Sequence, residues 1–380
     1  MKHPKKNNGG INMNACVKKW LQCTLALLLC LSLAILPCAA SAVGQTGGNL
    51  QIVFIDVGQA DAALVRCGGQ AMLIDGGNAA DSNTMYAVMQ KYGIQTLDYV
   101  IGTHAHEDHI GGIAGALNYA TVKTTYCPVT DYDSKAFQNF KKAVEACGSA
   151  ITVPNTGDSF TLGNAVCTIL AVNTTSDTNN TSIVLRIVYG DTSFLFTGDA
   201  ERDTEQAILA RGTDVRSTVL KVGHHGSETS TSYLWLREVD PTYAVISVGK
   251  GNSYGHPTEA VLSRLRDAEV TTFRTDMQGD ITCTSDGKKV TFSVSRNADA
   301  NVFGSIGPNS TQRETQAPKS DIASVQPVGQ TYILNTNTKK FHYPSCGSVK
   351  QMKESNKQSY TGSRDDVIAR GYVPCKKCNP

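Results

Sequence analysis

Residues 103–112 read Thr-His-Ala-His-Glu-Asp-His-Ile-Gly-Gly and bring several metal-capable side chains close together. These are His104, His106, Asp108 and His109, in a chain that holds only eight histidines. Neutral imidazole and ionised carboxylate bind divalent ions, so this cluster can hold one ion and often two. Residues 97–102 predict a buried strand before the cluster, and residues 110–117 predict a helix start after it. Open α/β proteins place their chemistry at strand ends of this kind.

Other strand ends carry side chains of the same types. They supply Asp75, Asp199, His224, His225 and His256, each of which follows an apolar run or lies in the loop Ser253–Pro257. Each has an ordinary structural explanation on its own, because Asp-Gly is a common turn and a histidine can cap a helix. Strand ends on one side of a sheet converge, however, so the set predicts one cleft. Lys221 is assigned to its strand, without a chemical role.

The C-terminus has a second group with metal-ligand spacing. His-x3-Cys and Cys-x2-Cys pairs are formed by His342, Cys346, Cys375 and Cys378. Four such ligands in two pairs predict a closed tetrahedral zinc site, and a module this small depends on metal to fold. The alternative is a disulfide or redox pair in the Cys-x2-Cys motif. Nine Lys or Arg against three acidic residues give residues 330–380 a net charge of +6. That charge predicts contact with a polyanion, although a solvated basic face is an equal alternative.

The sequence divides into four segments. Residues 1–42 predict a secretory signal peptide, with five lysines, an apolar stretch at 25–36 and the small-residue site Ala40-Ser41-Ala42. An uncleaved anchor is the alternative, so the expected location is extracellular or membrane-anchored. Residues 50–295 predict one domain, 297–329 a flexible linker rich in Asn, Ser, Gln, Gly and Pro, and 330–380 a compact module. The scattered cysteines allow at most one disulfide, between Cys127 and Cys147.

Within 50–295 the hydrophobic pattern alternates between strands and helices. Strands are predicted at 52–57, 62–66, 71–74, 166–172, 182–188, 193–196, 217–222 and 243–248, with a closing hairpin of 281–284 and 289–295. Helices are predicted at 82–92, 134–146, 201–211 and 258–268. Strand pairs followed by helices favour an α/β fold in which sheets are sandwiched between helices.

Residues 50–295 resemble the metallo-β-lactamase superfamily, and within it the extracellular hydrolase domains of ComEC-type competence proteins. The motifs that carry the resemblance are Asp56-Val57-Gly58-Gln59-Ala60-Asp61, Leu73–Gly77, Thr103–Gly112, Asn180–Leu185, Thr197-Gly198-Asp199, His224-His225-Gly226-Ser227 and Ser253–Pro257. The resemblance implies an αβ/βα sandwich with a two-metal site at the shared edge of two sheets. Ala60 stands where the competence pattern has Gly, a minor departure.

The same resemblance implies a role for each motif residue. His104 and His106 would hold one ion, Asp108 and His109 the other, and Asp199 would bridge them. One of His224 and His225 would complete the set, with His225 favoured, and Asp75 would orient a ligand ring. Catalytic roles fall to Asp108, to His256 and to the remaining His224, which would contact phosphate or move a proton. The ions would activate water and polarise a phosphoryl oxygen.

One departure bears on the choice of metal. Many superfamily members have a third metal-binding histidine where this chain has Asn180. An oxygen-richer site favours Mn²⁺ over Zn²⁺, so both remain candidates for the two ions. The missing histidine also disfavours lactam hydrolysis.

The C-terminal module is similar to the metal-binding domain of Ada, a methylphosphotriester repair protein. The shared pattern is Phe341-His342, Cys346, the helix at 364–370, Gly371–Cys375 and Cys378, with His342 standing where Ada has Cys. Because of that departure, alkyl transfer is not carried over, whereas DNA or polyanion binding is expected.

Together these patterns predict an exported metal-dependent phosphodiesterase, foremost a DNA nuclease, with a basic zinc module that binds DNA or the cell surface. The expected partner is DNA or another phosphodiester polyanion, with the cell wall as a further candidate. We expect a monomer that uses no nucleotide cofactor. Two alternatives stay open: a cell-wall phosphocholine or teichoic-acid esterase, and a non-catalytic DNA-binding surface protein.

Overall fold

The computed structural model describes residues 1, 48–173, 175–304, 330–362, 364–375 and 377–378. The predicted signal peptide, apart from Met1, and the linker residues 305–329 lie outside the described residues. All elements considered below belong to the unit Leu50–Pro380.

The first sheet of the hydrolase domain has eight strands, in the order β15-β14-β1-β2-β3-β4-β5-β6. The strands β3, β4, β5 and β6 run parallel, whereas the others pair antiparallel. Their bounds are β1 Leu50–Phe54, β2 Ala62–Cys67, β3 Gln70–Gly76, β4 Thr96–Ile101, β5 Thr121–Tyr126, β6 Ile151–Thr152, β14 Ile281–Ser285 and β15 Val290–Val294.

The second sheet has seven strands, in the order β13-β12-β11-β10-β9-β8-β7. Here β10, β11, β12 and β13 are parallel, so their carboxyl ends lie at one edge. Their bounds are β7 Ser159–Leu162, β8 Ala165–Ala171, β9 Val184–Tyr189, β10 Thr192–Phe196, β11 Val219–Lys221, β12 Tyr243–Ile246 and β13 Thr271–Arg274.

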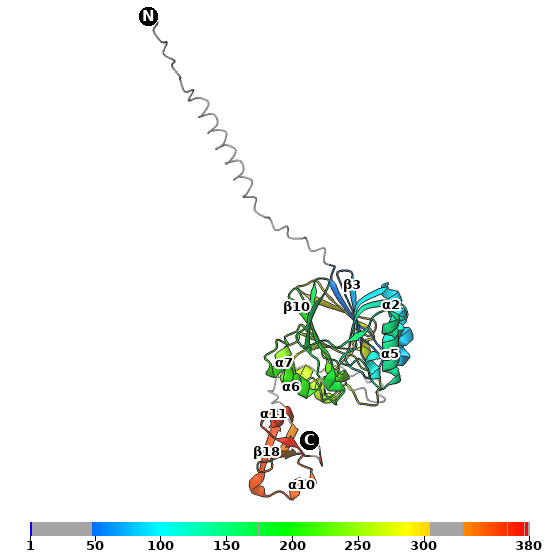
Figure 1. The fold of residues 1–380 in the computed structure, drawn as a ribbon. Coiled ribbons are helices and arrows are strands. Elements are labelled where there is room, and N and C mark those ends of the chain that lie inside the picture. Colours follow the sequence, from blue (N-terminus) through cyan, green and yellow to red (C-terminus); the bar gives the residue numbers. More distant parts are fainter. Residues whose placement is uncertain (2–47, 174, 305–329, 363, 376, 379–380) are drawn as a thin grey trace, which may run out of the picture. The chain divides into compact units, whose positions relative to one another are not determined.

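Helices cover the outer face of each sheet, which gives the predicted αβ/βα sandwich (Figure 1). Three buried cores separate the four layers. The core under the first helical layer includes Met85 and Phe137, the core between the sheets includes Phe54 and Phe196, and the third core includes Trp235. The helices are α2 Ser82–Tyr92, α3 Glu107–Ile110, α4 Ile113–Leu117, α5 Lys135–Ala146, α6 Arg202–Ala210, α7 Tyr233–Val239, α8 Glu259–Asp267 and α9 Thr275–Gln278, with 3-10 turns at Ala79–Asp81, Asn179–Thr181 and Gly223–Gly226.

Residues 297–304, at the start of the predicted linker, pack against this domain. Val302 is buried, and its carbonyl oxygen accepts a hydrogen bond of 2.8 Å from Arg274 Nη1. Phe303 packs against the third core, and the Arg266 guanidinium lies 5.2 Å from its ring centroid. The folded domain therefore extends past the closing hairpin, because apolar residues beyond it complete the core.

Two further observations concern the described part of the chain. Its cysteines are all free, so the suggested Cys127–Cys147 disulfide is absent; Cys127 is buried, and Cys147 Sγ faces Ala120 O at 3.9 Å. No helix in the described ranges is long and apolar enough to cross a membrane.

The C-terminal module has its own sheet and core. Four strands, β16 Gln330–Asn335, β17 Lys340–His342, β18 Lys357–Gly362 and β19 Val373–Pro374, are ordered β18-β16-β17-β19. The module also contains α10 Gly347–Lys350, a 3-10 turn at Glu354–Asn356 and α11 Arg364–Ala369. Its core is small and centres on Tyr332, Leu334, Phe341, Val367 and Tyr372. A core of this size gives limited stability, which is consistent with dependence on a metal.

Candidate metal centre

The predicted site residues converge because parallel strands of both sheets end at the same edge of the sandwich. In the first sheet, Asp75 lies on β3, and the His104–His109 segment follows β4. In the second sheet, Asp199 follows β10, and the 3-10 turn Gly223–Gly226 follows β11 and carries His224 and His225. The sequence places a polar side chain directly after each buried strand, and the fold brings those ends together.

One cluster at this edge combines four of the predicted ligands. Asp108, His109, Asp199 and His225 each offer an atom within 4.8 Å of the others. His109 Nε2 lies 3.3 Å from Asp199 Oδ1, and His225 Nε2 lies 3.3 Å from Asp108 Oδ2. Ligands around one tetrahedral ion at ordinary bond lengths are separated by about 3.3 Å. The spacing of these atoms therefore fits a divalent ion.

The hydrogen-bonding state of these atoms supports the same fit. Within the described residues, no hydrogen bond satisfies His109 Nε2, Asp199 Oδ1 or His225 Nε2, although all three atoms are buried. Buried polar atoms without partners cost free energy, so clusters of them call for an explanation. A bound cation would satisfy all three at once.

The opposite nitrogen of each of these two rings has an acceptor. His109 Nδ1 lies 2.9 Å from Asp75 Oδ2, and His225 Nδ1 lies 3.1 Å from the Ser247 carbonyl oxygen. Acceptors at Nδ1 hold a proton there, so Nε2 keeps a lone pair for a metal. Asp75 thus lies where its predicted orienting role requires.

His104 and His106 form a second donor pair on the other side of Asp199. His104 Nε2 lies 3.0 Å from His106 Nδ1 and 3.9 Å from Asp199 Oδ2. Asp199 Oδ2 lies between this pair and the four-residue cluster, because it is also 3.8 Å from His225 Nε2.

The histidines and carboxylates of the cluster shift one another's pKa values. Burial lowers the pKa of His225, but Asp199 and Asp61 outweigh burial and raise that pKa to about 10. Burial raises the pKa of Asp199, but His109 and His225 outweigh it and bring that pKa well below its usual range. Metal binding must therefore displace protons from the histidines, so affinity falls as the solution becomes more acidic.

His224 and His256 lie beside the cluster. His224 Nε2 is 3.6 Å from Asp199 Oδ2, and the side chain is 21% exposed, whereas that of His225 is 3% exposed. The His256 ring lies 5.8 Å from the His224 ring and stacks at 5.7 Å on Tyr254, which is 71% exposed. The structure thus brings His225 into the ligand set and leaves His224 and His256 at its solvent side.

Comparison with known proteins agrees with this geometry. The profile of the metallo-beta-lactamase superfamily matches residues 55–250. The chain belongs to this superfamily. Within it, the chain is 30% identical to ComE operon protein 3 of Bacillus subtilis, over 72% of this chain and 36% of that protein. It is 31% identical to competence protein ComA of Neisseria gonorrhoeae, over 59% of this chain and 30% of that protein.

The chain therefore spans about a third of the length of these curated relatives, at 36% and 30%. Their similarity to residues of this chain agrees with the ComEC-type resemblance of its sequence. Among solved structures, the metallo-beta-lactamase fold protein YhfI from Bacillus subtilis aligns with 59% of this chain and 95% of its own, at 16% identity and a TM-score of 0.42.

Asn180 stands where the resemblance places a metal-binding histidine in many superfamily members. Its side chain makes hydrogen bonds with residues outside the four-residue cluster. Its Oδ1 accepts hydrogen bonds from Glu201 N at 3.1 Å and Thr204 Oγ1 at 2.8 Å. Its Nδ2 donates to Asp177 Oδ2 at 3.1 Å. The side chain therefore organises the backbone around α6.

Sequence reasoning missed two residues of this metallo-beta-lactamase domain. Asp61 served only as part of a motif, and Lys221 was assigned no role, yet both are buried and Lys221 Nζ lies 2.8 Å from Asp61 Oδ2. The available signal was a lysine at the end of an apolar strand, because lysine is rarely buried without a partner.

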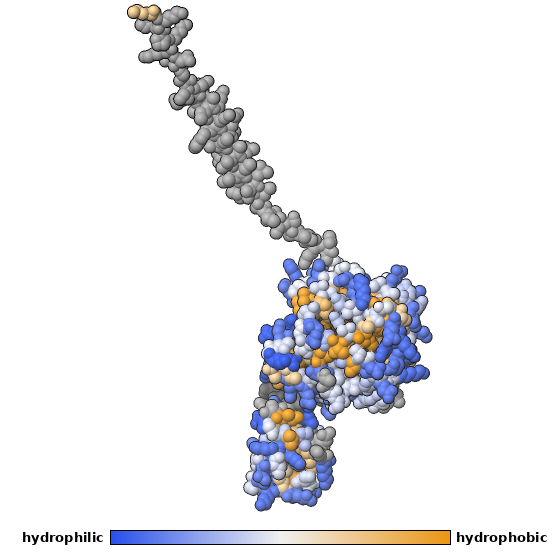
Figure 2. Space-filling model, in the orientation of Figure 1, coloured by the Kyte–Doolittle hydropathy of each residue, from blue (hydrophilic) through white to orange (hydrophobic). Residues whose placement is uncertain are grey.

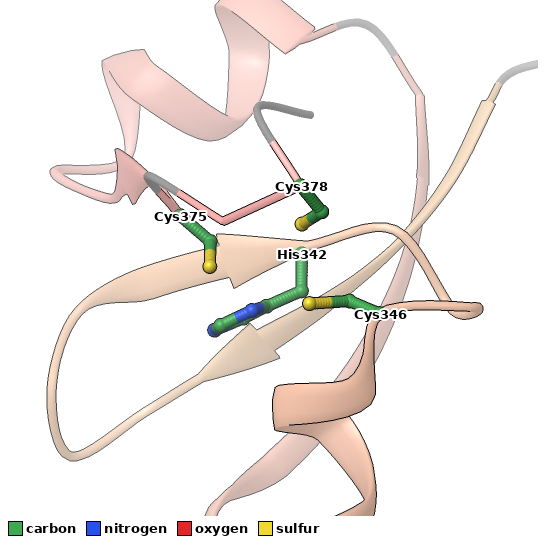
Figure 3. Close-up of side chains that lie close together, drawn as sticks. All are labelled: His342, Cys346, Cys375 and Cys378. Carbon is green, nitrogen blue, oxygen red and sulfur yellow. The ribbon is translucent and has the colours of Figure 1, made fainter.

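The C-terminal cluster forms a separate candidate metal site. His342, Cys346, Cys375 and Cys378 point toward one another from β17, the turn before α10 and the chain after β19 (Figure 3). Their ligand atoms lie within 4.8 Å of one another. A hydrogen bond with His342 lowers the pKa of the Cys346 thiol to about 6, which favours the thiolate that zinc binds. The donor set fits a structural zinc ion.

Proposed function

We propose that this metallo-hydrolase is an exported phosphodiesterase, foremost a DNA nuclease, that uses two divalent ions. The observation that carries the proposal is the cluster of Asp108, His109, Asp199 and His225. Three of its buried ligand atoms, His109 Nε2, Asp199 Oδ1 and His225 Nε2, have no hydrogen bond. His104 and His106 supply the donors for the first ion, and the four-residue cluster supplies those for the second. Zn²⁺ and Mn²⁺ are the candidate ions, and such ions supply Lewis acidity and a water of lowered pKa.

The chain's own residues then bind and orient the phosphodiester. His224 lies beside Asp199 and is partly exposed, so its ring can donate a hydrogen bond to a phosphate oxygen. Burial and the neighbouring His224 lower the pKa of His256 to about 4, so this ring is neutral at physiological pH. We assign His256 to phosphate contact through a ring N–H, because a ring with this lowered pKa is a weak base and stays neutral.

DNA is the proposed substrate on grounds of charge and relationship. One relative is named a competence protein, and the C-terminal module carries a net charge of +6. Hydrophilic residues cover much of the face of this module in Figure 2. Lysine and arginine bind phosphates by displacing counterions, so affinity for DNA should fall steeply with salt. The zinc-held module would in this way keep the polymer close to the hydrolase domain.

A phosphocholine ester is the second candidate substrate. Tyr254 is 71% exposed beside His256 and offers an aromatic face near the metal centre. Quaternary ammonium groups bind aromatic faces through cation–π attraction. The Tyr254 ring would also stack on a nucleobase. A direct comparison of the two substrates is therefore needed to choose between DNA and a phosphocholine ester.

The test is incubation of the full chain with plasmid, single-stranded DNA and a phosphocholine ester, with Mn²⁺ or Zn²⁺ supplied. We expect cleavage of both DNA forms and its loss in Asp108→Ala. Asp131→Ala is the matched control, because Asp131 pairs with Lys141 on the surface and should keep full activity. If Asp108→Ala cleaves all three substrates as well as the unchanged protein, the hydrolase proposal fails.

Binding by the module is tested separately. Deletion of residues 330–380 should weaken DNA affinity at low salt and leave hydrolysis of a small phosphodiester unchanged. An unchanged affinity after the deletion would contradict the binding role.

Export is proposed from the sequence of the N-terminal segment. It is tested by locating the protein in culture medium and cell fractions.

A further inference from the structure

Lys221 and Asp61 form a buried ion pair next to the metal centre. Only 4% of Lys221 and 5% of Asp61 is exposed. Lys221 Nζ donates to Asp61 Oδ2 at 2.8 Å and to Val222 O at 3.0 Å. A buried ion pair contributes little net stability, since apolar residues of similar volume often fold at least as well. The position of the pair next to the metal centre indicates a role other than stability.

The pair connects the two sheets at the edge where the ligands meet. Asp61 immediately precedes β2 of the eight-stranded sheet, and Lys221 is the last residue of β11 in the seven-stranded sheet. The second-ion ligands Asp108 and His225 are divided between the sheets in the same way, since they follow β4 and β11. The distance between these ligands therefore depends on the alignment that the ion pair fixes.

Asp61 also contacts both of these ligands directly. Its backbone N–H donates to the Asp108 carbonyl oxygen at 3.0 Å. Its Oδ1 lies 3.2 Å from His225 Nδ1, which also faces the Ser247 carbonyl oxygen at 3.1 Å. The Ser247 carbonyl accepts the hydrogen bond from Nδ1, and the Asp61 carboxylate, whose Oδ1 makes no hydrogen bond, adds its negative charge on the same side of the ring. That nitrogen therefore carries a proton, and Nε2 is directed at Asp108 and Asp199.

We propose that the Lys221–Asp61 pair is a positioning device for the second ion, which holds His225 with Nε2 toward the metal and fixes its distance from Asp108. Lys221 neutralises the Asp61 charge and occupies Oδ2. The inference rests on the proposed two-ion centre. Groups that orient metal-binding histidines contribute about 10- to 100-fold in metal affinity.

The test is Mn²⁺ binding to the full chain, followed by the EPR signal of free Mn²⁺. Mn²⁺ is the suitable probe because the thiolate-rich C-terminal cluster favours softer ions. The variant is Asp61→Leu/Lys221→Met, which replaces the ion pair with apolar groups and leaves no unpaired charge. We expect the first ion to bind as in the unchanged protein and the second to bind about 10- to 100-fold more weakly. Excess Mn²⁺ should restore DNA cleavage.

A second buried pair provides the matched control. Arg274 Nη2 lies 2.8 Å from Asp276 Oδ2, and the two side chains are 3% and 1% exposed. Neither residue is among the site residues. Arg274→Met/Asp276→Leu should bind both ions normally. Normal binding of both ions by Asp61→Leu/Lys221→Met would overturn the inference, as would equal weakening of both ions at an unchanged melting temperature.

A measurement on the unchanged protein covers the case in which the double variant does not fold. Histidine ¹⁵N spectra of the Zn²⁺-loaded chain should show His225 bound through Nε2 with a proton on Nδ1. Binding through Nδ1 would overturn the inference. If the unchanged protein binds only one Mn²⁺, the proposed two-ion centre fails instead, which separates the two failures.

Discussion

The carboxylate of Asp75 lies 2.9 Å from Nδ1 of His109, on the side of the ring opposite Asp199. Asp75 also accepts hydrogen bonds from the backbone and hydroxyl of Thr103, each at 2.8 Å. It therefore links a ligand ring to the segment that precedes the His104–His109 cluster. A carboxylate behind an imidazole fixes its orientation and strengthens it as a ligand.

Asp75→Asn should weaken metal binding by about 10- to 100-fold without unfolding the domain. Asp75 has a φ of 56°, a left-handed conformation that asparagine also tolerates. Metal titration followed by calorimetry is the measurement. Asp98→Asn is the control, because Asp98 is buried in the same sheet but pairs with Lys123. Equal affinities for Asp75→Asn and the unchanged chain would contradict the orienting role.

His225→Ala and His224→Ala should separate binding from catalysis. We expect His225→Ala to lose one ion, because its ring lies within the four-residue cluster. His224→Ala should keep both ions and lose roughly 10²- to 10⁴-fold in kcat if the ring assists proton transfer. Metal analysis of each purified variant, with kinetics at saturating metal, distinguishes the roles. The reverse pattern would make His224 the ligand.

Cys378→Ser should remove about one zinc ion per chain and open the C-terminal module to protease. The core around Phe341 is small, so we expect the ion to supply much of the stability of the module. Metal analysis and limited proteolysis measure the effect, and hydrolysis of a small phosphodiester should not change. Cys147→Ser is the control, since Cys147 is free and lies outside the cluster. A protease-resistant Cys378→Ser module would show that zinc is not structural.

Glu205→Gln should lose less stability than the unchanged domain when the pH rises from about 5 to about 8. Burial raises the pKa of Glu205 from 4.5 to about 7 in the folded chain, despite hydrogen bonds from the backbone of Thr231 and Ser232. The folded state thus holds the proton more tightly, and stability is lost as the pH rises from 4.5 to about 7. The loss is at most about 3 kcal/mol.

Thermal melts of both proteins at about pH 5 and about pH 8 measure this difference, with the exposed Glu259→Gln as control. Parallel changes of melting temperature in Glu205→Gln and the unchanged chain would show that Glu205 does not titrate in this range.

Local patterns predicted the strand ends and therefore most of the site. The run before Asp199 and the hexapeptide from His104 to His109 indicate metal-capable side chains at strand ends by residue type, whereas their individual roles are implied by the family resemblance. Short-range patterns also predicted α2 with its observed bounds, Ser82–Tyr92. The strand β5 and the helix α7 were not predicted; Lys123 and Thr124 break the apolar pattern in β5, and α7 is short, with exposed Tyr233 and Leu234.

Long-range relationships could not be predicted in this way. Nothing near Lys221 in the sequence indicates that it pairs with Asp61, since the contact depends on how two sheets align. The choice between His224 and His225 also required three dimensions. Both residues have left-handed backbone, with φ of 51° and 52°, and that turn decides which ring faces inward. The packing of Phe303 against the domain could not be predicted, because one aromatic residue in a polar stretch has no periodicity.

The arrangement of ligands on both sheets has a mechanical consequence. Asp108 and His109 belong to one half of the sandwich, and Asp199 and His225 belong to the other. An ion held by all four acts as a cross-link between two halves that are far apart along the chain. Metal loading would therefore determine whether the two halves of the sandwich unfold together or one after the other under mechanical force or on heating.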